Sequence, residues 1–348
     1  MSERKLFVVT LAAIIVIIVL LSLFTYLVVC FRESSRKILS VSSGRTYNST
    51  LIRNFSFDSV LLGTSLSQGF KCSEFDAAFG GKSIKLSSSG ANFAEMNEFL
   101  KFAVKHKKIK RAMLDVVVQF CVMEQTLKDF PAEYYSENLF KVRLNKATSI
   151  NGVLDELDFF RDMVRGKVKY TTRDALYDWN RKHSCSEKIF AQSILYQPHI
   201  NYLTQGNNCE KAYENTQKVL LPIIKTHANI EFIIFFPPVS IMNYQGEDYS
   251  KYITLKGRII DLLLTCSNVK LYDFETALHI TTDFNNYKDR IHYSGKINSW
   301  MLKEMSKDNY RITAQSKQQA LDKLLNALNS FDYRKECERL KTLYQKKR

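Results

Sequence analysis

The sequence predicts an α/β domain built on a mostly parallel, five-stranded sheet, with one transmembrane helix ahead of it. Short runs rich in Val, Ile, Leu and Phe alternate with longer segments whose apolar residues recur at helical spacing, as in parallel α/β folds. A separate apolar run near the N-terminus is too long for a strand. The five predicted strands occupy residues 57–65, 82–90, 110–120, 230–240 and 269–275.

The apolar run covers residues 6–31 and contains no charged side chain. A helix needs about 20 apolar residues to cross a bilayer, so this run is long enough. It ends in Tyr26, Cys30 and Phe31 rather than in the small residues of a cleavage site, which favours an uncleaved anchor over residues 1–37. Lys and Arg flank both ends almost equally. We expect a single-pass protein that contacts the lipid bilayer through residues 6–31, with its body outside the cytoplasm.

Composition narrows the class of protein further. The 348 residues carry 50 Lys and Arg against 35 Asp and Glu, a formal net charge of +15, and 45% of them are hydrophobic. That content excludes a disordered chain, and a mean hydropathy of −0.20 excludes a protein with many membrane spans. No nucleic-acid-binding motif is present, so we expect no nucleic-acid partner. The positive charge suits acidic lipid headgroups or an anionic polymer instead.

Changes in composition suggest the domain boundaries. Residues 38–56 are rich in Ser, Thr and Asn and are expected to form a tether, followed by an α/β domain over residues 57–313. Residues 122–208 break the strand–helix rhythm and are predicted to be a mostly helical insertion in that domain. Residues 314–348 are predicted to form a basic amphipathic helix that packs on the body.

The cysteines and histidines give no sign of a metal site. The sequence has no CxxC motif and no Cys/His pair at metal-binding spacing, so we expect neither a metal nor another cofactor. Cys185 and Cys209 flank a polar stretch and could form a disulfide in an oxidising compartment. Scattered buried thiols are the equally supported alternative.

Ser65 is the first candidate catalytic residue. The segment SVLLGTSLSQGF places it after the first predicted strand, with Gly63 relaxing the backbone just before it. A serine at a strand-to-helix turn presents its hydroxyl, and the helix N-terminus offers N–H groups to a developing oxyanion. Serine is also one of the preferred N-cap residues at a helix start, so the serine alone favours a capping role.

Asp289 and His292 change that balance. They lie two residues apart in NNYKDRIHYSGKINSW, in a loop that leads into an amphipathic helix starting near Ser294. In such a turn the carboxylate can reach Nδ1 of the imidazole, which leaves Nε2 free as a base. The alternative is an exposed Asp and His with no shared task. His279, near Asp283, is the rival pair.

Further donors follow the second and third predicted strands. In KLSSSGANF, Gly90 could offer a backbone N–H and Asn92 a side-chain N–H to the oxyanion, alongside the N–H of Ser65. An ordinary turn with Asn92 as a helix cap is the plainer interpretation. Gln119 is a less favoured donor. We assign Asp115, inside a strand, a structural role with Arg111 or a backbone donor as its partner.

Together these residues resemble the SGNH/GDSL esterase superfamily over about residues 57–305. The matching blocks are GTSLS at residues 63–67 in place of GDSL, the later Gly90, and the closing DxxH at residues 289–292. The resemblance implies a flavodoxin-like three-layer sandwich. Two departures are Thr64, which replaces the Asp of GDSL, and the lack of a GxND block after the third strand.

Within the superfamily, the chain is most similar to the membrane-anchored bacterial branch. That branch includes the D-alanyl transfer protein of teichoic acid synthesis and the alginate O-acetylation proteins. The resemblance implies an inner- or plasma-membrane protein that handles acyl groups of envelope glycans or anionic polymers, with a membrane-bound acyltransferase as a partner.

Two functions therefore follow from the sequence. In the first, Ser65 forms an acyl-enzyme, and the protein is an esterase or an O-acyltransferase. In the second, the same fold is a non-catalytic binding or assembly component of envelope polysaccharide modification or export. The intact Asp289/His292 pair favours the first function, and the missing GxND block favours the second.

Overall fold

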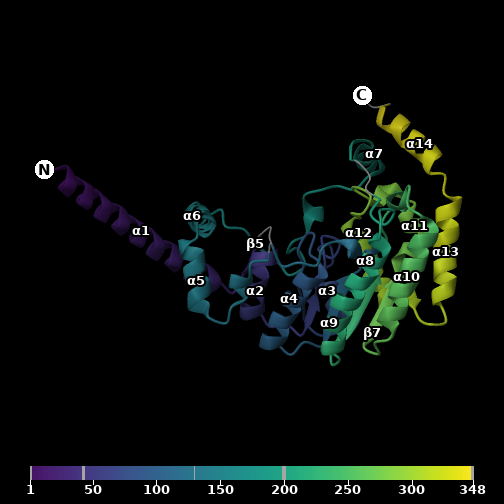
Figure 1. The fold of residues 1–348 in the computed structure, drawn as a ribbon, viewed down its shortest axis with the longest axis horizontal. Helices are drawn as coiled ribbons and strands as arrows, with labels where there is room; N and C mark the ends of the chain where they lie inside the picture. The colour runs from purple at the N-terminus through teal and green to yellow at the C-terminus, as the bar shows by residue number, and fades with distance from the viewer. Residues whose placement is uncertain (1, 41–43, 129, 198–200, 346–348) are drawn as a thin grey trace.

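The computed structural model describes residues 2–40, 44–128, 130–197 and 201–345. Its centre is a mixed α/β body around a six-stranded sheet with the strand order β3-β2-β4-β6-β7-β8 (Figure 1). The first five of these strands are parallel, and β8 pairs antiparallel with β7. The strands are β2 (Ser59–Leu61), β3 (Ser83–Lys85), β4 (Arg111–Asp115), β6 (Glu231–Phe236), β7 (Val269–Asp273) and β8 (Arg311–Ile312).

All five predicted strands are present, and the mostly parallel sheet is confirmed. The predicted strand count of five is corrected to six, because β8 adds a two-residue edge at Arg311–Ile312. Two residues carry no periodic pattern, so only their position beside β7 reveals this strand. The chain passes from β2 to one neighbour, β3, and then back to the other, β4. Side chains at the carboxyl ends of β2, β3 and β4 therefore converge at one edge.

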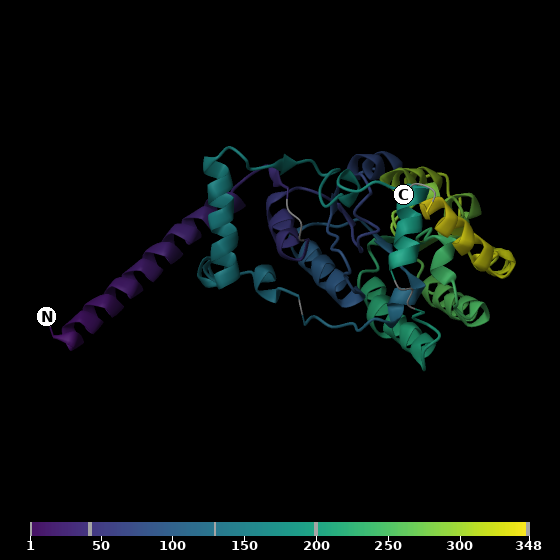
Figure 2. The same cartoon turned by 90° about the horizontal axis from the view of Figure 1, so that it is seen from above.

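The predicted helical segments between the strands are helices that bury one apolar face. In α4, Phe99, Leu100 and Ala103 are fully buried, and in α10, Ile259 and Leu263 are fully buried. Figure 2 shows these helices around the sheet from a second direction. The helices are α3 (Cys72–Phe79), α4 (Phe93–His106), α8 (Asn208–Asn215), α9 (Leu221–Thr226), α10 (Tyr249–Leu264), α11 (Leu278–Thr281) and α12 (Gly295–Met305).

The segment expected to be a tether is instead folded into the body at residues 38–40 and 44–56, while residues 41–43 lie outside the described residues. It contains β1 (Ile38–Leu39), which pairs antiparallel with β5 (Tyr170–Thr171), and α2 (Gly44–Asn54), which packs against α4. Although the segment is polar in composition, α2 has an apolar face, on which Tyr47, Leu51 and Ile52 are buried. The Tyr47 hydroxyl also accepts a hydrogen bond of 2.9 Å from the backbone N–H of Leu39.

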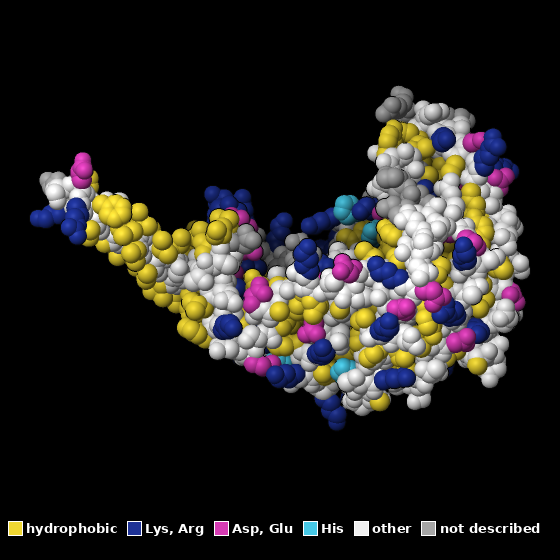
Figure 3. All heavy atoms as spheres, in the orientation of Figure 1, with side chains coloured by type: hydrophobic (Ala, Val, Ile, Leu, Met, Phe, Trp, Pro, Cys, Tyr) yellow, Lys and Arg dark blue, Asp and Glu magenta, His cyan; other side chains and the backbone are white. Residues whose placement is uncertain are grey.

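The N-terminal helix α1 (Glu3–Glu33) is long and apolar enough to cross a membrane, by length and composition. Its apolar side chains are exposed along most of the helix (Figure 3). Only its last turns are covered, where Thr25, Val28 and Val29 are buried. The covering elements are α5 (Leu139–Thr148) and α6 (Ile150–Val164) of the predicted insertion.

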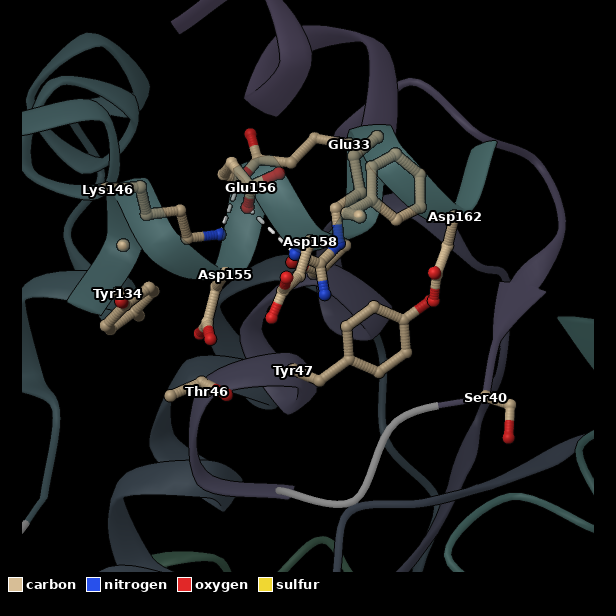
Figure 4. A pocket seen from close by; sticks show the side chains of 14 residues that line it. Glu33, Ser40, Thr46, Tyr47, Tyr134, Lys146, Asp155, Glu156, Asp158 and Asp162 are labelled. Carbon is tan, nitrogen blue, oxygen red and sulfur yellow. Dashed lines mark hydrogen bonds and ion pairs between the residues drawn. The ribbon is translucent and has the colours of Figure 1, made fainter. Parts of the chain in front are cut away.

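Ion pairs fix the end of α1 to these two helices (Figure 4). Arg32 pairs with Glu156 at 2.8 Å, and Glu33 pairs with Lys146 at 2.7 Å and Arg143 at 3.0 Å. A polar pocket of about 350 Å³ lies beside these pairs, between the end of α1, α2 and α6. The charged side chains at the end of α1 are therefore paired with opposite charges of the body.

The C-terminal segment forms two helices rather than one. Helix α13 (Lys317–Ser330) packs on α10, and α14 (Tyr333–Gln345) packs on α7 (Glu187–Tyr196). The apolar face of α13 is buried through Leu321, Leu324 and Leu328. In α14, Leu340 is buried and Arg339 pairs with Glu187, so part of the basic tail is bound to the body.

Lys85 in β3 is a fully buried lysine without a carboxylate at hydrogen-bond distance in the described chain. Its ammonium donates to the carbonyl oxygens of Gln68 at 2.9 Å and Asp174 at 2.7 Å. It thus connects the turn after β2 to the insertion. Burial lowers the pKa of Lys85 to about 8.

The pH dependence of stability tests this buried lysine. Between about pH 8 and pH 10.5, folded Lys85 has lost its proton while the unfolded chain keeps it, so rising pH favours the folded state. The free energy of unfolding of the wild type should rise relative to Lys85→Met by about 2 kcal/mol from pH 8 to pH 10. Chemical denaturation of both full-length proteins in detergent measures this difference. Parallel pH curves would contradict the burial of a charged lysine.

Candidate active site

Ser65 lies in a turn at the carboxyl end of β2, between the ends of β3 and β4. The turn is held by short-range bonds from Ser67 N–H to the Thr64 carbonyl (3.2 Å) and from Gln68 N–H to the Ser65 carbonyl (3.3 Å). Helix α3 begins only at Cys72. Ser65 is therefore neither a helix cap nor at a helix N-terminus, which corrects the expectation that a helix supplies N–H groups there.

A buried carboxylate holds this turn in place. Asp115, at the end of β4, accepts hydrogen bonds from the Thr64 N–H (2.9 Å), the Thr64 hydroxyl (2.8 Å) and the Ser67 hydroxyl (2.5 Å). Burial raises the pKa of Asp115, and these hydrogen bonds oppose the rise. The expected backbone donor is thus found, whereas Arg111 pairs with Glu231 instead.

Gly63 is required where the chain enters the turn. Its φ angle is +127°, a conformation that L side chains rarely adopt. A Cβ atom there would lie 2.1 Å from Asp115 Oδ1 and 2.5 Å from Ser67 Oγ. The closest approach of the turn to Asp115 therefore depends on the absence of a side chain.

Asp289 and His292 lie in a tight loop anchored at both ends. Tyr287 and Tyr293 form an antiparallel bridge, and both rings are buried. The Tyr287 hydroxyl donates to the Pro238 carbonyl after β6 at 2.7 Å, and the Tyr293 hydroxyl donates to the Leu66 carbonyl at 3.4 Å. This loop is therefore tied both to the sheet and to the turn that carries Ser65.

The three predicted catalytic side chains form one hydrogen-bonded line. His292 Nε2 lies 2.8 Å from Ser65 Oγ, and His292 Nδ1 lies 2.8 Å from Asp289 Oδ2. Asp289 Oδ1 also accepts the backbone N–H groups of Ile291 and His292. Burial raises the pKa of Asp289, but the hydrogen bonds and charge of His292 outweigh it, so the pKa is lowered. The carboxylate is therefore kept ionised beside the imidazole.

The two predicted backbone donors, the N–H groups of Ser65 and Gly90, belong to residues that line one pocket. The pocket has a volume of about 300 Å³, and Ser65, Gly90 and His292 line it. Within the described part of the chain, neither the N–H of Ser65 nor that of Gly90 has an acceptor. Both N–H groups are therefore available to a bound oxyanion.

The two predicted side-chain donors are not available. Asn92 accepts from the Glu95 N–H in a capping box at the start of α4, and its amide donates to the carbonyls of Glu124 and Thr126. The plainer interpretation of Asn92, a helix cap, is the one the structure supports. The amide of Gln119 is buried away from the pocket lining and has no partner among the described residues.

Sequence reasoning missed Trp179, which comes from the predicted insertion. Its Nε1–H donates to the Ser65 carbonyl at 2.8 Å, and its ring meets the His292 ring edge-on, with 5.2 Å between centroids. The adjacent Asn180 accepts the N–H of Gly295 at the start of α12 at 3.0 Å. Trp179 is one of only two Trp residues, but no local pattern relates it to Ser65.

The remaining candidates lie outside this arrangement. His279 is exposed and packs on Trp300, while Asp283 caps the following short turn, so the rival pair does not form. Cys185 and Cys209 are both free, and no disulfide joins them. In the ranges that the structure describes, no cluster of His, Cys, Asp or Glu is suited to a metal ion.

No family model matches the chain, and a search of curated proteins finds no relative. The geometry of the site therefore carries the functional argument. A serine paired with an imidazole that is oriented by a carboxylate can act as a nucleophile toward a carbonyl carbon.

Gly63→Ala should disrupt the turn that presents Ser65. Its Cβ would collide with Asp115, so we expect a loss of about 3 kcal/mol or more in stability and no reaction of Ser65 with a fluorophosphonate. Gly80→Ala is the matched control, because Gly80 also has a positive φ angle but open space around it. That control should lose about 1–2 kcal/mol and keep its reactivity. Equal effects of the two variants would contradict the role of Gly63.

Trp179→Phe separates the hydrogen bond of Trp179 from its ring contact. The variant keeps an aromatic ring beside His292 but removes the Nε1–H donor of the Ser65 carbonyl, which keeps only the longer hydrogen bond from the Gln68 N–H. We expect the labelling rate of Ser65 to fall about fivefold to tenfold, the equivalent of one hydrogen bond. Trp300→Phe, which changes the other tryptophan, should leave the rate unchanged. Kinetics of fluorophosphonate labelling measure both, and identical rates in the two variants would exclude this role.

Proposed function

We propose that the protein is a membrane-anchored, extracytoplasmic serine esterase or O-acyltransferase that acts on acyl groups of cell-envelope glycans or polymers. The observation that carries the proposal is the line from Ser65 through His292 to Asp289, with contacts of 2.8 Å at both steps. Acyl transfer also needs donors that stabilise the oxyanion, and the two free N–H groups of Ser65 and Gly90 in the same pocket can supply them.

The proposed reaction has two halves that use the same side chains. Ser65 Oγ bonds to the ester carbonyl carbon while its proton passes to His292 Nε2. The bond to the leaving alcohol then breaks, and that alcohol takes the proton from Nε2. Water or an acceptor hydroxyl next gives its proton to Nε2 and attacks the acyl-serine. The bond between the acyl group and Ser65 Oγ then breaks, Oγ takes the proton back from Nε2, and an acid or a new ester is released. Asp289 stabilises the imidazolium in both halves.

The fold is consistent with the proposed SGNH/GDSL relationship. Counted along the chain, the five parallel strands have the order 2-1-3-4-5, which is that of a flavodoxin-like doubly wound sheet. Ser65 follows the first of these strands, and the Asp289/His292 loop precedes the last helix before β8. Thr64, which replaces the Asp of the GDSL block, lines the pocket and donates its hydroxyl to Asp115.

The membrane assignment supports an envelope substrate. The last turns of α1 are bound by α5, α6 and ion pairs, which favours a retained anchor over a cleaved signal. We place the body outside a bacterial inner or plasma membrane, where a fixed glycan or anionic polymer is in reach of a basic protein. A membrane-bound acyltransferase is the proposed supplier of acyl groups.

The alternative function is a non-catalytic binding or assembly component on the same fold. The specific observation that favours it is that neither predicted side-chain group is available as a third oxyanion donor, since Asn92 caps α4 and Gln119 is outside the pocket lining. Loss of one such donor typically costs about 100-fold or more in rate. A slow transferase on a tethered substrate tolerates that loss better than a high-turnover hydrolase does.

Reaction with a fluorophosphonate distinguishes the two functions. The wild type should be labelled at one site, and Ser65→Ala should not be labelled at all. Ser89→Ala removes a neighbouring exposed serine and should label normally. Asp289→Asn should slow labelling by up to about 10⁴-fold, because the imidazole loses the partner that fixes its tautomer.

A folded wild-type protein that fails to react would support the non-catalytic alternative. Comparing envelope acylation in wild-type and Ser65→Ala cells then tests the transferase half. Lower acylation in the Ser65→Ala cells would support the transferase, whereas higher acylation would favour the esterase.

A further inference from the structure

The pocket beside Ser65 has an apolar wall. Its side chains come from the start of α4 and from the segment after β4, and the pocket opens at Ser65 and His292. Two methionines contribute flexible thioethers, which adapt to linear aliphatic chains. The apolar wall residues include Ala91, Phe93, Met96, Val117, Phe120 and Met123.

The carboxylate and the side-chain amides of this lining are already bound within the protein. Asp115 accepts three hydrogen bonds from Thr64 and Ser67, and Asn92 is committed to its cap. Gln125 accepts the Phe93 N–H at 2.8 Å and donates to the Met123 carbonyl at 3.0 Å. The described lining therefore holds no carboxylate free to bind the ammonium group of an aminoacyl ester.

The volume also bears on the acyl group. An apolar cavity of about 150 Å³ holds a benzene molecule, which has six carbons. The pocket here has about 300 Å³, including its mouth, so an acetyl methyl group would leave most of it unfilled. A chain of roughly four to eight carbons would fill it while its carbonyl stays beside Ser65.

We propose that the acyl group carried by Ser65 is an uncharged aliphatic chain of roughly four to eight carbons, rather than an acetyl or aminoacyl group. This inference rests on the proposed acyl-transfer function. The carbonyl lies between Ser65 and the N–H groups of Ser65 and Gly90, and the chain extends along the apolar wall. Every methylene that enters the wall leaves water, so affinity rises with chain length until the pocket is full.

Initial rates with p-nitrophenyl acetate, butyrate, hexanoate and octanoate test the proposal in the full-length protein. We expect kcat/KM to rise about threefold to fourfold per added methylene and to reach its maximum at hexanoate or octanoate. The alanyl ester should react more slowly than butyrate. A maximum at acetate or at the alanyl ester would overturn the inference, while fluorophosphonate labelling of Ser65 would still support the acyl-transfer site.

Ala91→Leu adds three carbons to the pocket and should move the preferred chain to a shorter ester. Fluorophosphonate labelling of this variant shows whether Ser65 is still intact. Ala320→Leu on α13, remote from the pocket lining, is the matched control and should keep the wild-type profile. An unchanged profile in a labelled Ala91→Leu protein would contradict the placement of the chain.

A second, independent inference concerns helices α5 and α6. They expose large apolar side chains beside the end of α1. A contiguous apolar patch of this kind is rare on the water-exposed surface of a soluble protein. Exposure reaches 80% for Ile150 and 61% for Phe140. The exposed apolar residues of the two helices are Leu139, Phe140, Leu144, Ile150, Leu154 and Val164.

The depth of these helices follows from their contacts with α1. A helix covers about 30 Å of hydrocarbon in about 20 residues, so a span that starts at Leu6 reaches the far boundary near Thr25. Thr25 donates a hydrogen bond of 2.9 Å to the Ala147 carbonyl. Phe24 and Tyr26 contact Phe160 and Phe140, with 4.8 and 6.0 Å between ring centroids. Helices α5 and α6 therefore lie where α1 leaves the hydrocarbon.

We infer that α5 and α6 lie in the membrane interface, with Phe140, Ile150 and their apolar neighbours inserted among the lipids. The occupant is the bilayer that α1 crosses, because the apolar surface of α1 continues onto these helices (Figure 3). Exposed cations follow α6 at Arg165, Lys167 and Lys169, where they can meet acidic headgroups. The anchor and this helical pair together would set the height of Ser65 above the membrane.

Tryptophan fluorescence tests this placement in the full-length protein, reconstituted in vesicles of phosphatidylcholine and phosphatidylglycerol. Trp introduced by Phe140→Trp or Ile150→Trp should add emission that is blue-shifted and quenched by brominated acyl chains. Tyr196→Trp, at an exposed site on α7, is the matched control and should add emission that the brominated lipids do not quench. Absence of quenching at positions 140 and 150 would overturn the inference and favour a protein partner on this face.

Discussion

The arrangement of the site depends on one buried carboxylate. Asp115 ends the central strand β4 and binds the backbone N–H and hydroxyl of Thr64 and the hydroxyl of Ser67, which lie before and after Ser65 in the turn. A buried carboxylate is costly unless it is hydrogen-bonded, so the turn and Asp115 stabilise each other. This mutual requirement leaves room only for glycine at position 63, and it holds the turn from which the Ser65 hydroxyl reaches His292.

The other half of the site is positioned by two buried tyrosines and meets this turn at the sheet edge. Buried Tyr287 and Tyr293 hold the ends of the loop that carries Asp289 and His292, one on the segment after β6 and one on the Ser65 turn. Trp179 then closes the arrangement from the insertion, with contacts to both Ser65 and His292. The Ser65 turn, the Asp289/His292 loop and Trp179 are far apart in the sequence and meet at this site. The insertion therefore contributes directly to the site.

The sequence predicted the features that have a local pattern. The five parallel strands, the apolar N-terminal helix and the pairing of Asp289 with His292 follow from periodicity or short spacing. Strand β8 did not, because two residues have no period, and α2 did not, because its buried face lies in a Ser- and Asn-rich segment. Trp179 and Asp115 act over 114 and 51 residues of chain, and only the folded topology brings them to Ser65. Asn92 was ambiguous in the sequence, and its hydrogen bonds identify it as a cap.

The central proposal is that Ser65 carries an acyl group covalently. Rapid acid quenching of the full-length protein with p-nitrophenyl hexanoate, followed by peptide mass spectrometry, tests this most directly. We predict a hexanoyl group on the peptide that contains Ser65, formed faster than it is lost and absent in Ser65→Ala. A folded wild-type protein with no adduct, or with the adduct on another residue, would contradict the account.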